Sequence, residues 1–236
     1  MTALTPRSAV VTGANRADGI GLALVRELRA RGCAPVVGTH RDPATAEALL
    51  EAAATDSDVL AAQVDVTSDA SVEAFGAWCT EYLGRVDLLV NNAGLGSKDA
   101  SIVSAPIEEL EYQVQVHGVG MLRVTRALLP LMGRGAVAVS VSSSLGSITD
   151  MNAGSTYYGP AKAFQNALTK QLAATVRRDG IVAFSASPGW VSTSMGGSAA
   201  PLTPEDSARR LADLVLGAGP DDAGTFRTVD GGTLAW

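Results

Sequence analysis

A tyrosine and a lysine four residues apart, Tyr158 and Lys162, are the side chains with the clearest chemical meaning in this sequence. On a helix, residues at this spacing share one face. A free tyrosine has a pKa of about 10, and a neighbouring lysine ammonium favours the phenolate and lowers that value. We therefore expect Tyr158 to act as a general acid or base beside Lys162. The alternative is a chance pair on a surface helix, because the spacing is common on its own.

A group of serines supplies a second element. The apolar segment before the tyrosine ends in Ser142, Ser143 and Ser144, and Ser143 stands fifteen residues before Tyr158. A hydroxyl at a strand end can donate a hydrogen bond to a carbonyl oxygen and hold it near a phenol. The alternative is that the three are plain strand-end serines.

A glycine-rich turn, Thr12–Gly21, joins the first apolar segment to a helical pattern. Glycines there permit a tight turn and let backbone N–H groups approach a pyrophosphate at the helix N-terminus. The alternative is a loop without a ligand, because short glycine patterns occur often by chance. The position after the first strand favours a dinucleotide site, with contacts from Gly13, Asn15, Arg16, Gly19, Ile20 and Gly21.

The end of the second strand predicts which dinucleotide the chain prefers. An NAD site commonly has an acid there for the ribose hydroxyls, and here that position aligns with His40. Arg41 would pair with a 2′-phosphate, and Arg16 would approach the same phosphate from the glycine turn. We interpret Asp42 as the N-cap of a helix that begins at Pro43; the alternative is that Asp42 faces the ribose. We expect NADP(H), with NAD(H) as the alternative cofactor.

Alternating apolar and amphipathic segments predict the elements that position these residues. Continuous apolar runs are typical of strands buried on both faces, and we expect seven of them, at Ser8–Val11, Pro35–Thr39, Val59–Val64, Asp87–Val90, Ala136–Ser142, Ile181–Ser185 and Thr225–Val229. The helical patterns between them include Gly21–Arg31, Pro43–Ala54, Ala70–Leu83, Glu108–Leu129 and Ser155–Arg178. This alternation predicts a single α/β domain over residues 1–236, a doubly wound seven-stranded parallel sheet with helices on both faces. Its ligand crevice would lie at the carboxyl ends of the strands.

Four segments in this order resemble the short-chain dehydrogenase/reductase family with its Rossmann fold: the glycine turn, Asn91-Asn92-Ala93-Gly94, the serine at 143 and Tyr-x-x-x-Lys. The resemblance extends over residues 8 to 236, and Ser194–Gly197 is similar to the C-factor-like carbonyl reductase branch. The glycine turn has two more residues between its first two glycines than the family pattern, a spacing similar to that of enoyl reductases on the same fold. Those enzymes space Tyr and Lys seven residues apart, so the spacing here favours carbonyl or alcohol chemistry.

The resemblance implies roles for further residues. Ser143 would polarise the substrate carbonyl, Lys162 would bind ribose hydroxyls as well as the phenol, and Thr193 would bind the nicotinamide carboxamide. The positions that border the cofactor in the family match Asp65, Val66, Asn91, Ala93, Gly94, Tyr158, Lys162, Pro188, Gly189, Val191 and Thr193.

One segment departs from the family pattern. Most members have a catalytic Asn within Val-Asn-x-x-Gly, and here Gln115 stands at that position in Tyr112–Gly118. In the family this residue holds a water that links the lysine to solvent, and Gln keeps the amide but adds a methylene. We expect Gln115 to support the proton relay. His117, two residues on, is the alternative member of that relay, although such a histidine is more often simply packed.

These features predict an NADP(H)-dependent oxidoreductase that transfers hydride between nicotinamide and a ketone, aldehyde or secondary alcohol. The alternatives are a cofactor-assisted isomerase, dehydratase or cyclase, which Gln115 motivates, and a non-catalytic NADP(H)-sensing module. The substrate would be a small, rather apolar carbonyl or alcohol compound, bordered by Leu95–Ala105, Gly146–Tyr157 and Trp190–Pro204.

Composition limits the remaining classes. The net charge of −6 disfavours nucleic acid and anionic membrane as partners, and no apolar run is long enough to span a bilayer. Cys33 and Cys79 have neither metal-type spacing nor a framework of pairs, so we expect reduced thiols, a cytoplasmic location and no metal site. Pairing through the helices at 108–129 and 155–178 would give a homo-oligomer, a dimer or tetramer.

Overall fold

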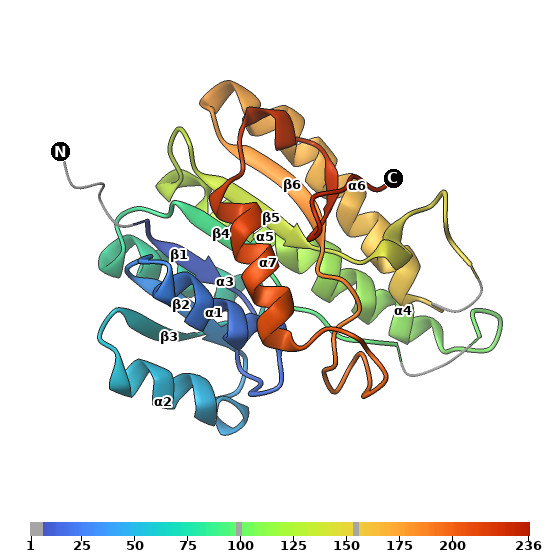
Figure 1. Ribbon diagram of the computed structural model, residues 1–236, viewed down its shortest axis with the longest axis horizontal. Coiled ribbons are helices and arrows are strands. Elements are labelled where there is room, and N and C mark those ends of the chain that lie inside the picture. Colours follow the sequence, from blue (N-terminus) through green and yellow to red (C-terminus); the bar gives the residue numbers. More distant parts are fainter. Residues whose placement is uncertain (1–6, 98–100, 153–155) are drawn as a thin grey trace.

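The computed structural model describes residues 7–97, 101–152 and 156–236. Within them, seven parallel strands form one sheet in the order β3-β2-β1-β4-β5-β6-β7 (Figure 1). All seven lie where the apolar runs predict them, and the predicted fold class is confirmed. The strands are β1 Ala9–Val11, β2 Val36–His40, β3 Val59–Gln63, β4 Leu88–Asn91, β5 Val137–Val141, β6 Val182–Ser187 and β7 Phe226–Thr228.

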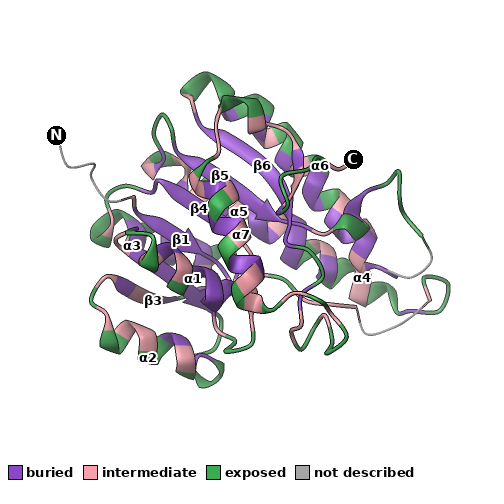
Figure 2. Cartoon of the chain, in the orientation of Figure 1, coloured by how far each residue is buried: buried purple, intermediate pink, exposed green. Residues whose placement is uncertain are grey.

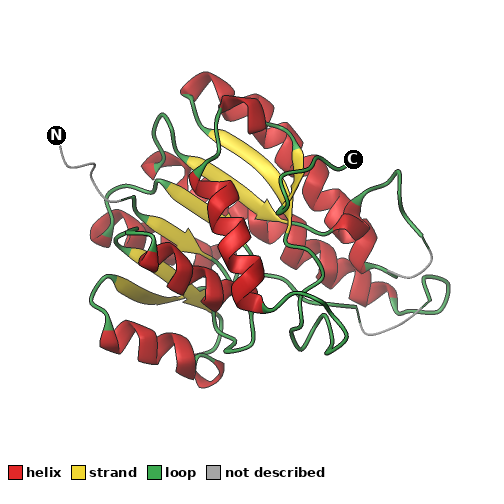
Figure 3. Cartoon of the chain, in the orientation of Figure 1, coloured by secondary structure: helices red, strands yellow, loops and turns green. Residues whose placement is uncertain are grey.

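Helices cover both faces of the sheet (Figures 1 and 3). Side chains of α1, α2 and α7 pack in one apolar cluster with the strands, and those of α3, α5 and α6 pack in a second cluster on the opposite face. α4 precedes α5 and contacts α6. The helices are α1 Ile20–Ala30, α2 Glu47–Thr55, α3 Asp69–Tyr82, α4 Ile107–Val114, α5 Met121–Leu128, α6 Tyr158–Val176 and α7 Pro204–Leu216.

The central strands are apolar along their length because both of their faces are covered. In β4, Leu88 and Val90 belong to the cluster beneath α1 and α7, whereas Leu89 belongs to the cluster beneath α3 and α5. Side chains alternate between the faces of a strand, so a strand with helices on both sides has no polar face. Figure 2 shows the resulting buried layer through the middle of the molecule.

Two expected helices differ in detail from their predicted form. The segment Glu108–Leu129, expected as one helix, contains a π turn at Gln115–Gly120 between α4 and α5. The segment that begins at Pro43 is first a 3₁₀ turn and then α2. The Asp42 carboxylate accepts a hydrogen bond from the Ala44 N–H at 2.9 Å, so its interpretation as an N-cap is confirmed.

The strand order reverses on either side of β1, which pairs with β2 on one side and β4 on the other. Val11 lies opposite Gly38 and Val90, so the three strands end at the same edge of the sheet. In open α/β sheets this reversal is where ligands bind. Of the expected substrate borders, residues 98–100 and 153–155 lie outside the described part of the chain. None of the helices within the described ranges is long and apolar enough to cross a membrane.

Candidate active site

A cleft of about 820 Å³ opens along the carboxyl ends of the strands. Most of the residues predicted from the sequence line it: Gly13, Asn15, Arg16, Gly19, Ile20, Gly21, His40, Arg41, Asp65, Val66, Ala93, Gly94, Tyr158, Lys162, Pro188 and Thr193. The structure therefore brings together residues from five strand ends and from the first turn of α6. The other predicted residues are not in the lining: Asn91 and Val191 are buried next to it, Gly189 and Gln115 are exposed, and Ser143 is half-buried after β5.

The glycine turn at the start of α1 is held tightly against the loop that follows β4. Gly13 has a φ of 68°, and a Cβ there would lie 2.7 Å from the Cα of Ala93. The Thr12 hydroxyl accepts hydrogen bonds from the backbone N–H groups of Asn92 and Ala93, each at 3.0 Å. The Asn92 side chain donates back to the Thr12 and Gly13 carbonyls. The Asn-Asn-Ala-Gly segment thus locks the two loops together, as well as bordering the cleft.

The first turn of α1 is suited to an anion. Its N-cap is Gly19, and no described side chain caps the helix. The first N–H groups of a helix have no partner within it and carry the positive end of the helix dipole. Glycines at 19 and 21 both line the cleft, and they let the turn fold closely on itself, because a Cβ would lie 3.1 Å from the Arg16 carbonyl at 19 and 2.6 Å from Nδ2 of Asn92 at 21. The turn therefore fits a pyrophosphate.

The far end of the cleft carries Arg41 together with the carboxylates of Asp42 and Asp65. The Arg41 guanidinium donates a hydrogen bond to the Tyr112 hydroxyl at 2.7 Å. The pKa of Asp65 is lowered by the hydrogen bonds that its carboxylate accepts from Thr67 and, to a smaller extent, by the charge of Arg41. His40 is buried, and its burial lowers its pKa. The Asp42 carboxylate caps the turn at Pro43 and keeps its negative charge. Arg41 is the arginine at this end whose guanidinium can pair with a phosphate.

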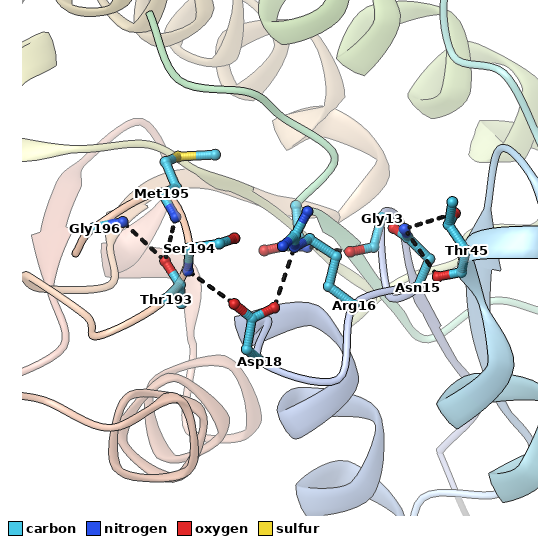
Figure 4. Close-up of polar contacts among 10 residues, drawn as sticks. Gly13, Asn15, Arg16, Asp18, Thr45, Thr193, Ser194, Met195 and Gly196 are labelled. Carbon is cyan, nitrogen blue, oxygen red and sulfur yellow. Dashed lines mark hydrogen bonds and ion pairs between the residues drawn. The ribbon is translucent and has the colours of Figure 1, made fainter. Parts of the chain in front are cut away.

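Arg16 does not stand free beside Arg41. Its Nε lies 3.1 Å from Oδ1 of Asp18, within the same glycine turn, and both side chains are exposed (Figure 4). Asn15, next to it, donates to the Thr45 hydroxyl at 3.2 Å. Arg16 lines the cleft as predicted. Its ion pair with Asp18 was not predicted from the sequence.

The phenol and the ammonium meet at the floor of the cleft. Tyr158 is the first residue of α6, and Lys162 follows one turn later with its Nζ 5.7 Å from the centre of the tyrosine ring. The Lys162 ammonium donates to the Val141 carbonyl at 2.7 Å and to Oε1 of Gln165 at 3.0 Å. Ser143, after β5, forms a hydrogen bond with Tyr158. The three side chains predicted to act together are thus adjacent.

The protonation of this group differs from the expectation. Burial raises the pKa of Tyr158 to about 12, and the hydrogen bond from Ser143 opposes that rise only in part. Burial lowers the pKa of Lys162 to about 7. We predicted that Lys162 would lower the pKa of Tyr158. In the protein without a bound cofactor, the desolvation of both groups instead outweighs their mutual attraction. Tyr158 is therefore a protonated phenol at neutral pH.

Gln115, which we expected to support the proton relay, is exposed and is not among the residues that line the cleft. Its Oε1 accepts a hydrogen bond at 3.1 Å from Arg123 on the outer side of the helix. His117 lies on the inner side instead, fully buried, with its ring edge-on to Tyr158 at a centroid distance of 5.4 Å. Two residues along a helix turn the side chain by about 200°, so only one of the two can face the cleft.

His117 is a neutral imidazole held by the loop after β4. Burial, and then the charge of Lys162, keeps the pKa of His117 well below its usual range. Its Nε2 lies 2.8 Å from the Leu95 carbonyl oxygen and 3.4 Å from the Leu95 backbone N, and the shorter contact favours the tautomer with the proton on Nε2. The other nitrogen, Nδ1, is buried and finds no hydrogen-bond partner among the described residues. Gln113, one turn earlier, donates to the Gly96 carbonyl at 2.9 Å and fixes the same loop.

The family model described as short chain dehydrogenase matches residues 7–202. The chain belongs to the short-chain dehydrogenase family. A short chain dehydrogenase, gsfK, of Penicillium aethiopicum is 32% identical over 254 residues, which cover 98% of this chain and all of that protein. The C-signal protein of Myxococcus xanthus is 32% identical over 156 residues, 65% of this chain and 94% of that protein.

Two solved structures show the same short-chain dehydrogenase architecture. The carbonyl reductase Sniffer of D. melanogaster superposes with a TM-score of 0.92 at 30% identity, covering 98% of this chain and all of that one. An NADPH-bound carbonyl reductase from chicken fatty liver gives a TM-score of 0.92 at 30% identity, with 99% and 100% coverage. The predicted resemblance to the family and to its carbonyl reductase-like branch is confirmed. The chain is thus a short-chain dehydrogenase, an oxidoreductase fold with its Tyr-x-x-x-Lys pair in the cleft.

Proposed function

We propose that this chain is an NADP(H)-dependent carbonyl reductase, which interconverts a ketone or aldehyde and the corresponding alcohol. The observation that carries the proposal is the position of Tyr158 and Lys162 side by side in the cleft that begins at the glycine turn, with Ser143 hydrogen-bonded to Tyr158. A hydroxyl, a protonated phenol and a buried amine at one point suit proton transfer to a carbonyl oxygen.

The cleft fits the dinucleotide in two places. The uncapped first turn of α1 would hold the pyrophosphate, and Arg41 would hold the 2′-phosphate that distinguishes NADP(H) from NAD(H). The NADPH-bound state of the chicken fatty liver enzyme, which shares the fold at 30% identity, supports the choice of cofactor.

Each side chain of the cleft then has one task. When bound, the nicotinamide dinucleotide supplies the hydride that forms the new C–H bond, or accepts it in the reverse reaction. Ser143 donates a hydrogen bond to the carbonyl oxygen and holds it near the phenol. Tyr158 gives its proton to that oxygen, which completes the alcohol and leaves a phenolate. The protonated form of Lys162 stabilises this phenolate by electrostatic attraction, which is strong because both groups are buried.

His117 takes the place that the sequence reasoning gave to Gln115. Its ring packs edge-on against Tyr158, and its buried Nδ1 can accept a hydrogen bond on the path by which the phenolate regains a proton. Because Gln115 lies outside the cleft, it no longer motivates an isomerase, dehydratase or cyclase. The intact Ser143, Tyr158 and Lys162 favour an enzyme over a non-catalytic sensor.

An apolar carbonyl compound suits the mouth of the cleft. Exposed apolar side chains stand on the segments that leave β5 and β6 there: Ile148, Met151, Trp190 and Met195. Met195 lines the cleft itself. Such side chains stabilise a substrate whose carbonyl carries an apolar substituent.

We also propose a cytoplasmic homo-oligomer. Cys33 and Cys79 are both buried, and burial raises the pKa of each thiol, which suits unreactive reduced cysteines. Ile107 and Phe164, on α4 and α6, are exposed apolar residues on the two helices expected to pair. Light scattering after size exclusion would show a single chain mass if this pairing is wrong.

The function is tested by dinucleotide titration and by a matched pair of tyrosine variants. Wild type should bind NADPH more tightly than NADH and oxidise it with a panel of apolar ketones, aldehydes and quinones. Tyr158→Phe should lose at least about a hundredfold in kcat with an unchanged NADPH Kd. The control is Tyr157→Phe, because the Tyr157 hydroxyl donates to the Ala105 carbonyl, away from the reacting group.

Failure of wild type to bind either nucleotide would refute the proposal. Binding without turnover, together with an unaltered biological effect of Tyr158→Phe, would instead favour the sensing module.

A further inference from the structure

The glycine turn reaches across the cleft to a segment that is distant in sequence. The turn has two more residues between its first two glycines than the family pattern, and Asp18 is one of the residues between these glycines. Oδ2 of Asp18 accepts a hydrogen bond at 2.8 Å from the backbone N–H of Ser194, which is 176 residues away in the chain (Figure 4). The Arg16 guanidinium, 3.1 Å from the other carboxylate oxygen, holds the same carboxylate from within the turn.

The carboxylate is ionised throughout the physiological range. The hydrogen bond from the Ser194 N–H is the largest cause that lowers the pKa of Asp18, followed by Arg16. A hydrogen bond to an ionised acceptor is stronger than one between neutral groups. The contact is therefore present at any pH at which the enzyme would work.

The segment bound by Asp18 is a unit in itself. The Thr193 hydroxyl accepts a hydrogen bond from the Gly196 N–H at 3.0 Å, and the Trp190 indole donates to the Gly196 carbonyl at 2.8 Å. On the opposite rim, a Cβ at Gly96 would lie 3.2 Å from Cγ of Met195. The segment Thr193–Gly196 thus spans the cleft, with Asp18 at one end and the loop after β4 at the other.

Asp18 itself stands outside the cleft. Thr193, Ser194 and Met195 line it, as do Arg16 and Gly19 on either side of Asp18, whereas Asp18 is absent from the described lining. The carboxylate consequently does not face the space in which a dinucleotide would lie. Asp18 therefore acts on a bound dinucleotide through the two groups that it holds, the backbone N–H of Ser194 and the guanidinium of Arg16, and only the first of these holds the segment.

We propose that Asp18 is a positioning residue that keeps the segment Thr193–Gly196 closed over the cleft, so that the dinucleotide leaves only after the Asp18–Ser194 hydrogen bond has opened. The inference rests on the proposed function for the identity of the ligand. The longer glycine turn then has a task of its own: it closes the cleft from the pyrophosphate side.

The test compares Asp18→Ala, Asp18→Asn and Asp213→Ala with the wild type. Asp213 is an exposed carboxylate that pairs with Arg31 away from the cleft, and it controls for the loss of a surface charge. The first readout is hydrogen exchange of the peptide containing the Ser194 amide, in the protein without nucleotide. The second is the dissociation rate of NADPH, measured by displacement with excess NADP⁺ and nicotinamide fluorescence.

Asp18→Ala should raise both the amide exchange rate and the NADPH dissociation rate about tenfold, because one charge-assisted hydrogen bond is lost. Asp18→Asn, whose amide oxygen still accepts, should show a smaller rise, and Asp213→Ala none. Unchanged exchange in Asp18→Ala would overturn the closure, and faster exchange with an unchanged dissociation rate would overturn its link to the dinucleotide. If the wild type binds neither NADPH nor NADH, the proposed function fails first and this inference fails with it.

Discussion

Lys162 makes the stability of the folded chain depend on pH in a way that can be worked out from its burial. Burial lowers the pKa of this side chain from 10.5 to about 7. Between these values the unfolded chain holds a proton that the folded chain has released. The free energy of unfolding therefore rises with pH across this window, by about 1.4 kcal/mol per pH unit from this group. Below pH 7 both states are protonated and the contribution is flat.

Substitution with Met isolates this contribution. Lys162→Met keeps the length of the side chain and removes the charge, but it also leaves the Val141 carbonyl and the Gln165 amide oxygen without their donor. That loss is independent of pH, so it shifts the stability of the variant by a constant. The difference in unfolding free energy, wild type minus Lys162→Met, should rise by about 2.5 kcal/mol between pH 7.5 and 9.5.

Urea denaturation of the nucleotide-free proteins, followed by far-ultraviolet circular dichroism at several pH values, measures this difference. Lys170→Met, an exposed lysine on the same helix, is the control for the substitution itself. A wild-type-minus-variant difference that stays constant from pH 7.5 to 9.5 would refute the reasoning, because it would mean that the Lys162 ammonium remains well solvated in the folded chain.

Three further predictions concern the cleft and its support. His117→Ala should lower kcat at least tenfold with little change in NADPH affinity, whereas Gln115→Ala should stay within about twofold of wild type; steady-state kinetics compare them, and equal effects would contradict the assignment. Arg41→Ala should weaken NADPH binding at least about tenfold and NADH binding less than twofold, and parallel losses in titrations of both would exclude a 2′-phosphate contact. A Cβ at Gly21 would collide with the Gly13 carbonyl and lie 2.6 Å from Nδ2 of Asn92, so Gly21→Ala should destabilise the chain by about 1–3 kcal/mol. In urea denaturation, Gly133→Ala is its control, since no described atom lies within 4 Å there; equal stability of the two would argue against the clash.

The sequence predicts the fold well because the pattern is local and repeated. The strands other than β7 carry runs of apolar residues, and each loop after a strand carries its own glycine, amide or hydroxyl group. The contact between Tyr158 and Lys162 follows from helical spacing alone, and the place of Ser143 follows from the end of β5. Parallel strands bring their carboxyl ends to one edge, so these local signals suffice to assemble the cleft.

The choice between Gln115 and His117 could not be made from the sequence. The pattern Val-x-x-x-Gly occurs twice, in Val114–Gly118 and again in Val116–Gly120, with an offset of two residues. Either residue can therefore take the second position of the family motif. In the structure His117 faces inward, against Tyr158 and the loop after β4, whereas Gln115 faces Arg123; these contacts are tertiary and do not follow from local spacing.

Two other properties depend on tertiary contacts. The pKa of Tyr158 is decided by burial, which the presence of a lysine four residues away does not reveal. The hydrogen bond between Asp18 and Ser194 joins residues on two loops that leave different strands. The sequence pointed to both loops, through the longer glycine turn and the segment around Thr193, but not to the contact between them.

The π turn at Gln115–Gly120 puts α4 and α5 out of phase. A π turn holds one residue more than an α turn, and one residue corresponds to about 100° of rotation. Deleting that residue would give a uniform helix, but it would swing either Gln113 and His117 away from the loop after β4 or Val124 and Leu128 out of the core. Neither half can rotate alone without loss of the cleft or of the packing. Loss of the additional residue in evolution would consequently require simultaneous changes in α4 and in α5.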